Sequence, residues 1–137
     1  MEFITVEQFK EQPVEVQKMF LDWWKPRIGD IFIFNTDEYD NSDSNIGVLG
    51  SIKQINITRR SKGKYRIPLF TEGQLRKFIE DKTNIDTILG ISDCKEYVIA
   101  LIKNDDELYE MIDTKETNSL QAYWKLACMI AKEEVDE

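Results

Sequence analysis

The sequence predicts an α+β fold, a single compact domain over residues 1–137 in which helices pack on a mainly antiparallel sheet. Two observations predict this class. Helical patterns open the chain, and strand and helix patterns then interleave with connections short enough for hairpins. A 42% hydrophobic fraction, with three Trp, five Tyr and seven Phe, supplies a core, and no Gly/Ser/Pro-rich linker divides the chain. We expect packing helices at the N-terminus, in the centre and at the C-terminus.

Residues 1–25 predict two helices that meet at a corner. Thr5 and Gln8 match the capping box, which satisfies two amide hydrogens at a helix start. Pro13 breaks the first helix and suits the first turn of the second. Pro26 disfavours helical geometry at the residue before it and ends the second helix. The expected helices cover residues 6–12 and 13–24, and the apolar stripe of the second comprises Val16, Met19, Phe20 and Trp23, with Trp24 beside it.

Residues 30–67 predict strands, among them a hairpin rich in cations. Ile31–Phe34 is a continuous run of apolar, β-favouring residues and is the first strand. Apolar residues then alternate imperfectly on both sides of Ser61-Lys62-Gly63, a sequence typical of a turn. We therefore expect hairpin strands near residues 52–58 and 64–67.

The second half of the chain predicts a helix, a hairpin and a last helix. Thr71 and Gln74 form another capping box, and Asn118 and Gln121 resemble one. Val, Ile and Leu dominate the strand expected at residues 97–102, and Asn-Asp-Asp turn chemistry follows it. The expected elements are a helix over 71–82, a loop over 83–96 with a short strand at 87–91, a hairpin over 97–112 and a helix over 119–134. A helical turn at residues 108–112 is the alternative to the second strand of this hairpin. The apolar stripe of the last helix comprises Leu120, Tyr123, Trp124, Ala127 and Ala131.

Composition excludes several classes of chemistry. The chain has no His, which excludes Ser-His triads, His general bases and imidazole zinc sites. Cys94 and Cys128 form neither a CxxC pair nor a disulfide framework, and we expect both to be buried apolar residues. The Asp, Asn and Ser residues of 36–45 lack the order of a calcium loop, so we expect a solvated loop there. No motif for a cofactor, a metal or a catalytic centre is present, and we expect no cofactor, no metal and no enzymatic activity.

The charge balance bears on partners and location. A net charge of −8 opposes general attraction to duplex nucleic acid, although a basic sub-region can override it locally. The N-terminus lacks the cationic-then-apolar pattern of a secretion signal, and no apolar run is long enough to span a membrane. We expect an intracellular, soluble protein with no membrane partner.

The expected basic hairpin is the sharpest candidate site. It carries five cations within eight residues, and guanidinium groups bind phosphates bidentately while a neighbouring Tyr can stack on a base. The alternatives are a solvated hairpin whose charges keep an edge strand from pairing, neutralisation of acidic neighbours in an oligomer, and adhesion to an acidic protein. The candidate phosphate-binding residues are Arg59, Arg60, Lys62, Lys64, Tyr65 and Arg66.

Trp24 is the candidate for a protein interface. Among Trp23, Trp24 and Trp124 we expect at least two to be core residues. Adjacent helical residues point about 100° apart, so Trp23 and Trp24 cannot both lie at the centre of one stripe. One is then available to a partner, since Trp is enriched at interface hot spots. The acidic clusters at 105–107 and 133–137 are expected to be a charged turn and a frayed tail rather than a mimic of nucleic acid.

Three segments carry a resemblance: WWKPRIGD, IPLFTEGQLRKFIED and LQAYWKLACMIAKEE, somewhat under a third of the chain. They resemble a family of small uncharacterised proteins encoded by phages and prophages of Gram-positive (Firmicute) bacteria. The resemblance implies a viral accessory protein acting in the bacterial cytoplasm, and it transfers no catalytic residue.

The expected function is therefore non-enzymatic binding of a host factor involved in defence or gene expression, by occlusion through an exposed Trp and one charged face. One alternative is a binder that sequesters a nucleotide-type small ligand through the basic hairpin, as an oligomer. A second alternative is a small hydrolase with carboxylate chemistry.

Overall fold

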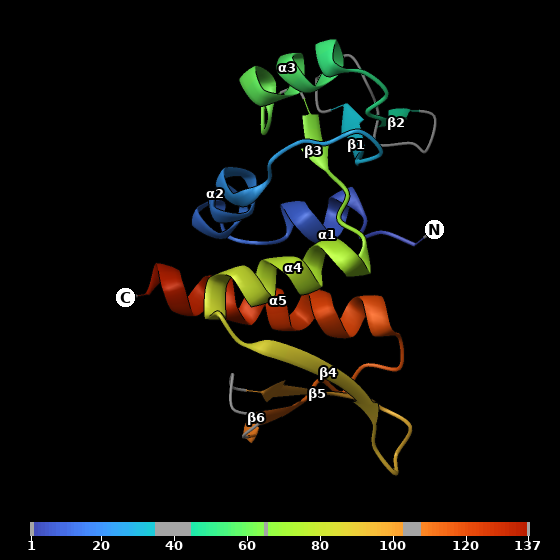
Figure 1. The fold of residues 1–137 in the computed structure, drawn as a ribbon, viewed down its shortest axis with the longest axis vertical. Coiled ribbons are helices and arrows are strands. Elements are labelled where there is room, and N and C mark those ends of the chain that lie inside the picture. Colours follow the sequence, from blue (N-terminus) through green and yellow to red (C-terminus); the bar gives the residue numbers. More distant parts are fainter. Residues whose placement is uncertain (1, 35–44, 65, 103–107, 137) are drawn as a thin grey trace. The chain divides into compact units, whose positions relative to one another are not determined.

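The computed structural model describes residues 2–34, 45–64, 66–102 and 108–136. Its fold class is α+β, as predicted, with five helices and two antiparallel three-stranded sheets in the described residues (Figure 1). The chain groups into two compact units, unit 1 (Met1–Ile4 with Thr71–Glu137) and unit 2 (Thr5–Phe70). The prediction of one domain over 1–137 stays a prediction. No helix in the described residues is both long and apolar enough to cross a membrane.

Unit 2 begins with the two predicted helices, α1 (Val6–Lys10) and α2 (Val14–Trp23). The capping box at the start of α1 is present, since the Thr5 Oγ1 accepts from the Gln8 amide at 3.1 Å and the Gln8 Oε1 accepts from the Thr5 amide at 3.0 Å. α1 ends two residues before the predicted bound. The backbone becomes extended at Trp24, two residues before the proline that was expected to end α2.

The sheet of unit 2 has the order β2-β1-β3, where β1 is Ile31–Phe34, β2 is Ile46–Val48 and β3 is Arg66–Pro68. Both outer strands pair antiparallel with β1. β1 is the predicted first strand, and its first three residues are buried. Residues 36–44 of the predicted Asp/Asn loop lie outside the described residues.

The prediction of a basic hairpin is wrong. Its first strand is instead a helix, α3 (Ile52–Ser61), and its second strand overlaps β3, which pairs with β1. A local reason is the cap, because the Ser51 Oγ accepts from the Gln54 amide at 3.2 Å and starts a helix. The alternation that suggested a strand was imperfect, and spacing of three between Ile52 and Ile55 fits a helix as well.

Unit 1 contains α4 (Glu72–Thr83), β4 (Asp86–Ile91), β5 (Tyr97–Ile102), β6 (Leu108–Asp113) and α5 (Ser119–Val135). The sheet order is β4-β5-β6, antiparallel throughout, and α4 and α5 lie side by side over one face of this sheet (Figure 1). The predicted helices, the short strand and the hairpin are confirmed. Buried side chains that join α4, α5 and β5 comprise Leu75, Phe78, Ile79, Ile99, Leu101, Leu120, Tyr123, Ala127 and Ala131.

Candidate functional site: a basic surface on α3

α3 is held to unit 2 along one side only. Thr58 is its one fully buried residue. The Thr58 hydroxyl donates to the Gln54 carbonyl at 2.8 Å and accepts from the Arg66 Nη1, also at 2.8 Å. The start of the helix is fixed by Ser51 and by the Gln54 side chain, whose Oε1 accepts from the Gly50 amide at 2.7 Å. These contacts leave the opposite side of a capped helix in solvent.

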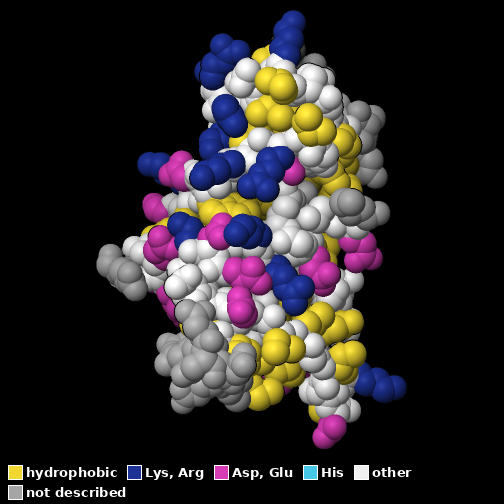
Figure 2. Space-filling model, viewed as in Figure 1, with side chains coloured by type: hydrophobic (Ala, Val, Ile, Leu, Met, Phe, Trp, Pro, Cys, Tyr) yellow, Lys and Arg dark blue, Asp and Glu magenta, His cyan; other side chains and the backbone are white. Residues whose placement is uncertain are grey.

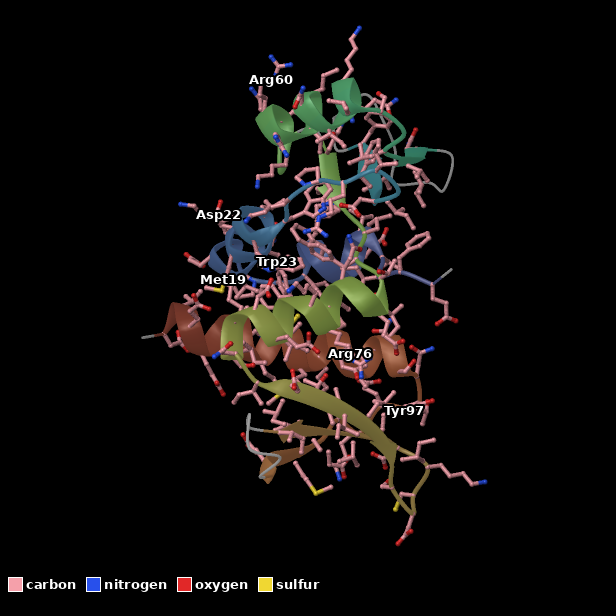
Figure 3. The ribbon with its side chains drawn as sticks, in the orientation of Figure 1. Met19, Asp22, Trp23, Arg60, Arg76 and Tyr97 are labelled. Carbon is pink, nitrogen blue, oxygen red and sulfur yellow. The ribbon has the colours of Figure 1, made fainter. Side chains whose placement is uncertain are left out.

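The outward side of α3 carries cations beside polar and apolar residues. Positions three, four and seven apart on a helix share a side, and the five residues on this side are all exposed. Figure 3 shows Arg60 projecting away from the ribbon at the end of α3, and in Figure 2 Lys and Arg side chains lie around apolar side chains over this helix. We name this surface the α3 basic face; it comprises Ile52, Lys53, Asn56, Arg59 and Arg60.

The charges of the chain are divided unevenly. Residues 45–70 contain six cations and no Asp or Glu: Lys53, Arg59, Arg60, Lys62, Lys64 and Arg66. Unit 2 has ten Lys and Arg against nine Asp and Glu, whereas unit 1 has eight against seventeen. The acidic excess of the chain therefore belongs to unit 1. Screening over about 10 Å at ordinary ionic strength makes the local charge of α3 more relevant to a ligand than the total.

The predicted phosphate-binding residues separate into two groups. Arg59, Arg60 and Lys64 are exposed. The Arg60 Nε donates to the Asn56 carbonyl of its own helix at 3.3 Å, which leaves the rest of the guanidinium outward. Lys62 is half-buried and its Nζ donates to the Trp24 carbonyl at 3.0 Å. Tyr65 lies outside the described residues.

The pKa of Lys62 is lowered, chiefly because burial disfavours its charge. Asp22 opposes this effect and Arg59 adds to it. An ammonium group bonded to a backbone carbonyl and partly removed from water is less available to a phosphate than an exposed one. Lys62 therefore helps to hold α3 to the rest of unit 2, and it is not one of the exposed cations on the outward side of the helix.

Arg66 also has a structural position. Its guanidinium lies over the rings of Phe32, at 4.7 Å, and Phe34, at 5.3 Å, and it donates to Thr58 on α3. Burial lowers its pKa. Stacking on two β1 rings while bonding to the helix connects α3 to the sheet of unit 2. Arg66 positions the α3 basic face and is not part of it.

The interpretation of Trp24 as an exposed interface residue is wrong. Its side chain is 1% exposed, and its Nε1 donates to the Asp30 Oδ2 at 2.9 Å. The same carboxylate oxygen accepts from the Arg27 amide at 3.0 Å. Trp23 is the partly exposed member of the pair, with its ring edge-on to Phe70 at 5.9 Å. Trp24 and Trp124 are buried, so the expectation that at least two of the three Trp residues are core is confirmed.

The two cysteines differ, so the prediction that both are buried is half wrong. Cys94 is exposed and Cys128 is buried. Burial raises the pKa of the Cys128 thiol to about 12, a direction that Lys132 opposes. Within the described residues no three His, Cys, Asp or Glu side chains gather as metal ligands. The acidic cluster at 105–107 lies outside the described residues.

A surface pocket of about 390 Å³ lies in unit 1 at the starts of α4 and α5. The N-termini of helices favour anions, but the pocket is lined by two carboxylates and by no cation: its lining comprises Glu2, Thr71, Glu72, Gly73, Ser119 and Leu120. Because those carboxylates oppose an anion, the α3 basic face is the better candidate.

Comparisons of the chain with protein-family models, with curated proteins and with solved structures found no match. The resemblance to phage-encoded proteins therefore stays a prediction. Sequence reasoning identified Arg59 and Arg60 but missed Ile52, Lys53 and Asn56 as their neighbours. The signal that could have found them is the Ser51-x-x-Gln54 start, which precedes a helix on which these residues share one side.

Proposed function

We propose that this protein binds nucleic acid, with the α3 basic face contacting the phosphate backbone. The supporting observation is that Lys53, Arg59 and Arg60 are exposed on one side of a helix inside a segment that contains no acidic residue. Guanidinium groups bind phosphate oxygens bidentately, and a Lys ammonium adds a point charge. The phosphate backbone supplies most of the affinity of proteins that bind nucleic acid without a deep pocket.

The geometry favours a polymer over a mononucleotide. The outward side of a helix is convex, and Lys53 and Arg60 are seven residues apart, about 10 Å along the axis. A chain of phosphates contacts both, whereas one nucleotide reaches one of them and stays largely in water. The nucleotide-sequestering alternative needs convergent groups around a cavity. The exposed cations of α3 diverge.

Neutral residues of the same face suit contacts beyond phosphate. The Asn56 side chain lies between the cations and can donate to and accept from base edges or sugars. Ile52 is 71% exposed at the start of α3 and offers an apolar contact to a base. A helix of ten residues is about 15 Å long and has a diameter that fits the major groove of duplex DNA. Duplex and single-stranded ligands share the phosphate chemistry, and the experiment below separates them.

The remaining expectations are independent of this proposal. Phage or prophage origin, a bacterial cytoplasmic location and the lack of enzymatic activity stay predictions. Occlusion of a host factor also stays a prediction, but it has lost Trp24 as its aromatic contact.

The test is fluorescence anisotropy of labelled oligonucleotides, about 20 nucleotides long, titrated with the full chain at about 50 mM and about 200 mM salt. Duplex DNA, single-stranded DNA, single-stranded RNA and ATP are the ligands. We expect at least one polymer to bind, and its affinity to fall steeply between the two salt concentrations. ATP binding tighter than every polymer would overturn the proposal in favour of a nucleotide site.

Two double variants make the test specific. Arg59→Gln with Arg60→Gln removes two cations from the α3 basic face, while Lys77→Gln with Lys132→Gln removes two exposed cations from unit 1 and changes the net charge equally. We expect the α3 variant to bind about tenfold or more weakly and to lose about two units of salt slope. The unit 1 variant should change affinity by less than about threefold. Equal losses in both variants would reduce the effect to net charge and refute the site.

A further inference from the structure

β4 forms an edge of the sheet in unit 1, and its backbone direction can be worked out from its neighbours. Tyr97 lies opposite Ile91 in the β4–β5 register. The Tyr97 amide donates to the Glu116 carbonyl at 2.7 Å and its carbonyl accepts from the Thr114 amide at 3.1 Å, so both groups face away from β4. Ile91 and Tyr97 are therefore a non-hydrogen-bonded pair, in which the Ile91 N–H and C=O point to the outer edge.

A second contact supports the same outward direction of the backbone groups at another residue of β4. The Thr87 carbonyl accepts from the Arg76 Nη2 at 3.4 Å, and Arg76 belongs to α4 rather than to β5. Thr87 thus also directs its backbone outward, and Leu89, midway between Thr87 and Ile91, does the same because strand residues alternate. The outer edge presents the backbone groups of three residues, of which one carbonyl is occupied by Arg76.

The strand carries few of the devices that keep edges from pairing. β4 reads Asp-Thr-Ile-Leu-Gly-Ile and contains neither Lys nor Pro. Ile88 is 57% exposed and Ile91 is 65% exposed. Arg76 covers the edge at Thr87, but the N–H and C=O groups of Leu89 and Ile91 face outward along an apolar stretch.

We propose that the β4 edge pairs antiparallel with β4 of a second copy of this chain, around a twofold axis at Gly90. This register places Leu89 opposite Ile91 of the other copy, and each such pair exchanges both of its hydrogen bonds. It uses the outward groups of Leu89 and Ile91 and leaves the Thr87 carbonyl to Arg76. The edge is thus complementary to itself, which is the condition for a closed dimer. Two three-stranded sheets become one antiparallel sheet.

Size and charge define how this dimer behaves. Strands of six residues are about 20 Å long, so the contact is well below the roughly 800 Å² per partner of a stable interface, and the association is reversible. Each chain carries a net charge of −8 and unit 1 carries the acidic excess, so the two copies repel. Dimerisation therefore strengthens as salt rises, whereas binding of nucleic acid weakens. The opposite salt responses separate the two proposals.

The experiment is analytical ultracentrifugation of the full chain from about 10 µM to about 1 mM, at about 50 mM and about 500 mM salt. We expect a monomer–dimer equilibrium with a lower dissociation constant at the higher salt. Ile91→Pro removes an outward N–H, and we expect it to raise the dissociation constant about tenfold or more. Ile91→Val keeps the N–H and the strand preference, and it should dimerise like the native chain.

A backbone substitution needs a folding control. Far-UV circular dichroism and thermal unfolding should be nearly unchanged in Ile91→Pro, because the lost N–H faces away from β5. Should Ile91→Pro unfold the sheet, Ile91→Glu replaces it, since an added carboxylate on the same edge also weakens pairing of two acidic copies. A monomer at every concentration, or a dimer that neither variant weakens, would overturn the inference.

Discussion

Truncating Trp24 distinguishes a core residue from a surface residue. The side chain is 1% exposed, and its indole N–H donates to the Asp30 carboxylate at 2.9 Å. Trp24→Ala removes the largest fully buried side chain and leaves the Asp30 oxygen with one donor fewer. Loss of a buried Trp costs about 3–5 kcal/mol. With an unfolding entropy of about 2.1 cal/mol/K per residue, that loss lowers the melting temperature of a 137-residue chain by roughly 10–17 °C.

The assay is thermal unfolding followed by far-UV circular dichroism, combined with urea denaturation. Trp23→Ala is the matched control, because it removes the same side chain from the neighbouring, partly exposed position. We expect the control to lose clearly less stability. A drop of less than about 3 °C for Trp24→Ala, with the control equal or worse, would refute the burial of Trp24 and restore it as a surface candidate.

Four further outcomes test other parts of the structure. A thiol reagent at about pH 8 should modify Cys94 quickly and Cys128 only after unfolding; equal rates would contradict the burial of Cys128. The pKa of the Cys128 thiol rises from 9.0 to about 12 in the folded state, so the thiol ionises at lower pH in the unfolded chain. The free energy of unfolding should therefore fall as pH rises from about 9 to about 12, and it should fall less in Cys128→Ala. Thr71→Ala should lower stability by about 1 kcal/mol in urea titrations, with Thr71→Ser close to native, because the Thr71 hydroxyl caps α4; an equal loss in both would point away from the cap. Gly63→Ala should cost about 1–2 kcal/mol, since Gly63 has φ +83° and a Cβ there would lie 2.7 Å from the Leu21 Cδ1; unchanged urea unfolding would show that the turn adapts.

Three of the helices that sequence reasoning found have local start signals. Thr5, Thr71 and Asn118 each accept a hydrogen bond from the amide three residues later, and the helices begin where the pattern places them. α3 has the same kind of cap at Ser51, but β-branched residues obscured it. Ile52, Ile55 and Ile57 fit a strand and a helix about equally over so short a run. The pairing of β3 with β1, far away in the chain, then decided the arrangement.

The candidate site was predictable as a set of residue types but not as a surface. Five cations near residue 60 are plain in the sequence. Which of them face solvent depends on distant partners: Lys62 bonds to the Trp24 carbonyl, and Arg66 lies over Phe32 and Phe34. Neither partner is near in the sequence. The division of charge between the two units likewise appears only once the fold assigns each residue to a unit.

The sequence by itself determined the α+β class, three helix starts, the hairpin of unit 1 and the absence of His chemistry. The class, the helix starts and the absence of His depend on composition and on hydrogen bonds between residues three positions apart, and the hairpin joins two strands that follow one another in the chain. The tertiary structure alone decided that β3 pairs with β1, that Trp24 is core and that Arg59 and Arg60 are outward. Burial and strand pairing set these features, and both join residues far apart in the chain, so no local pattern encodes them.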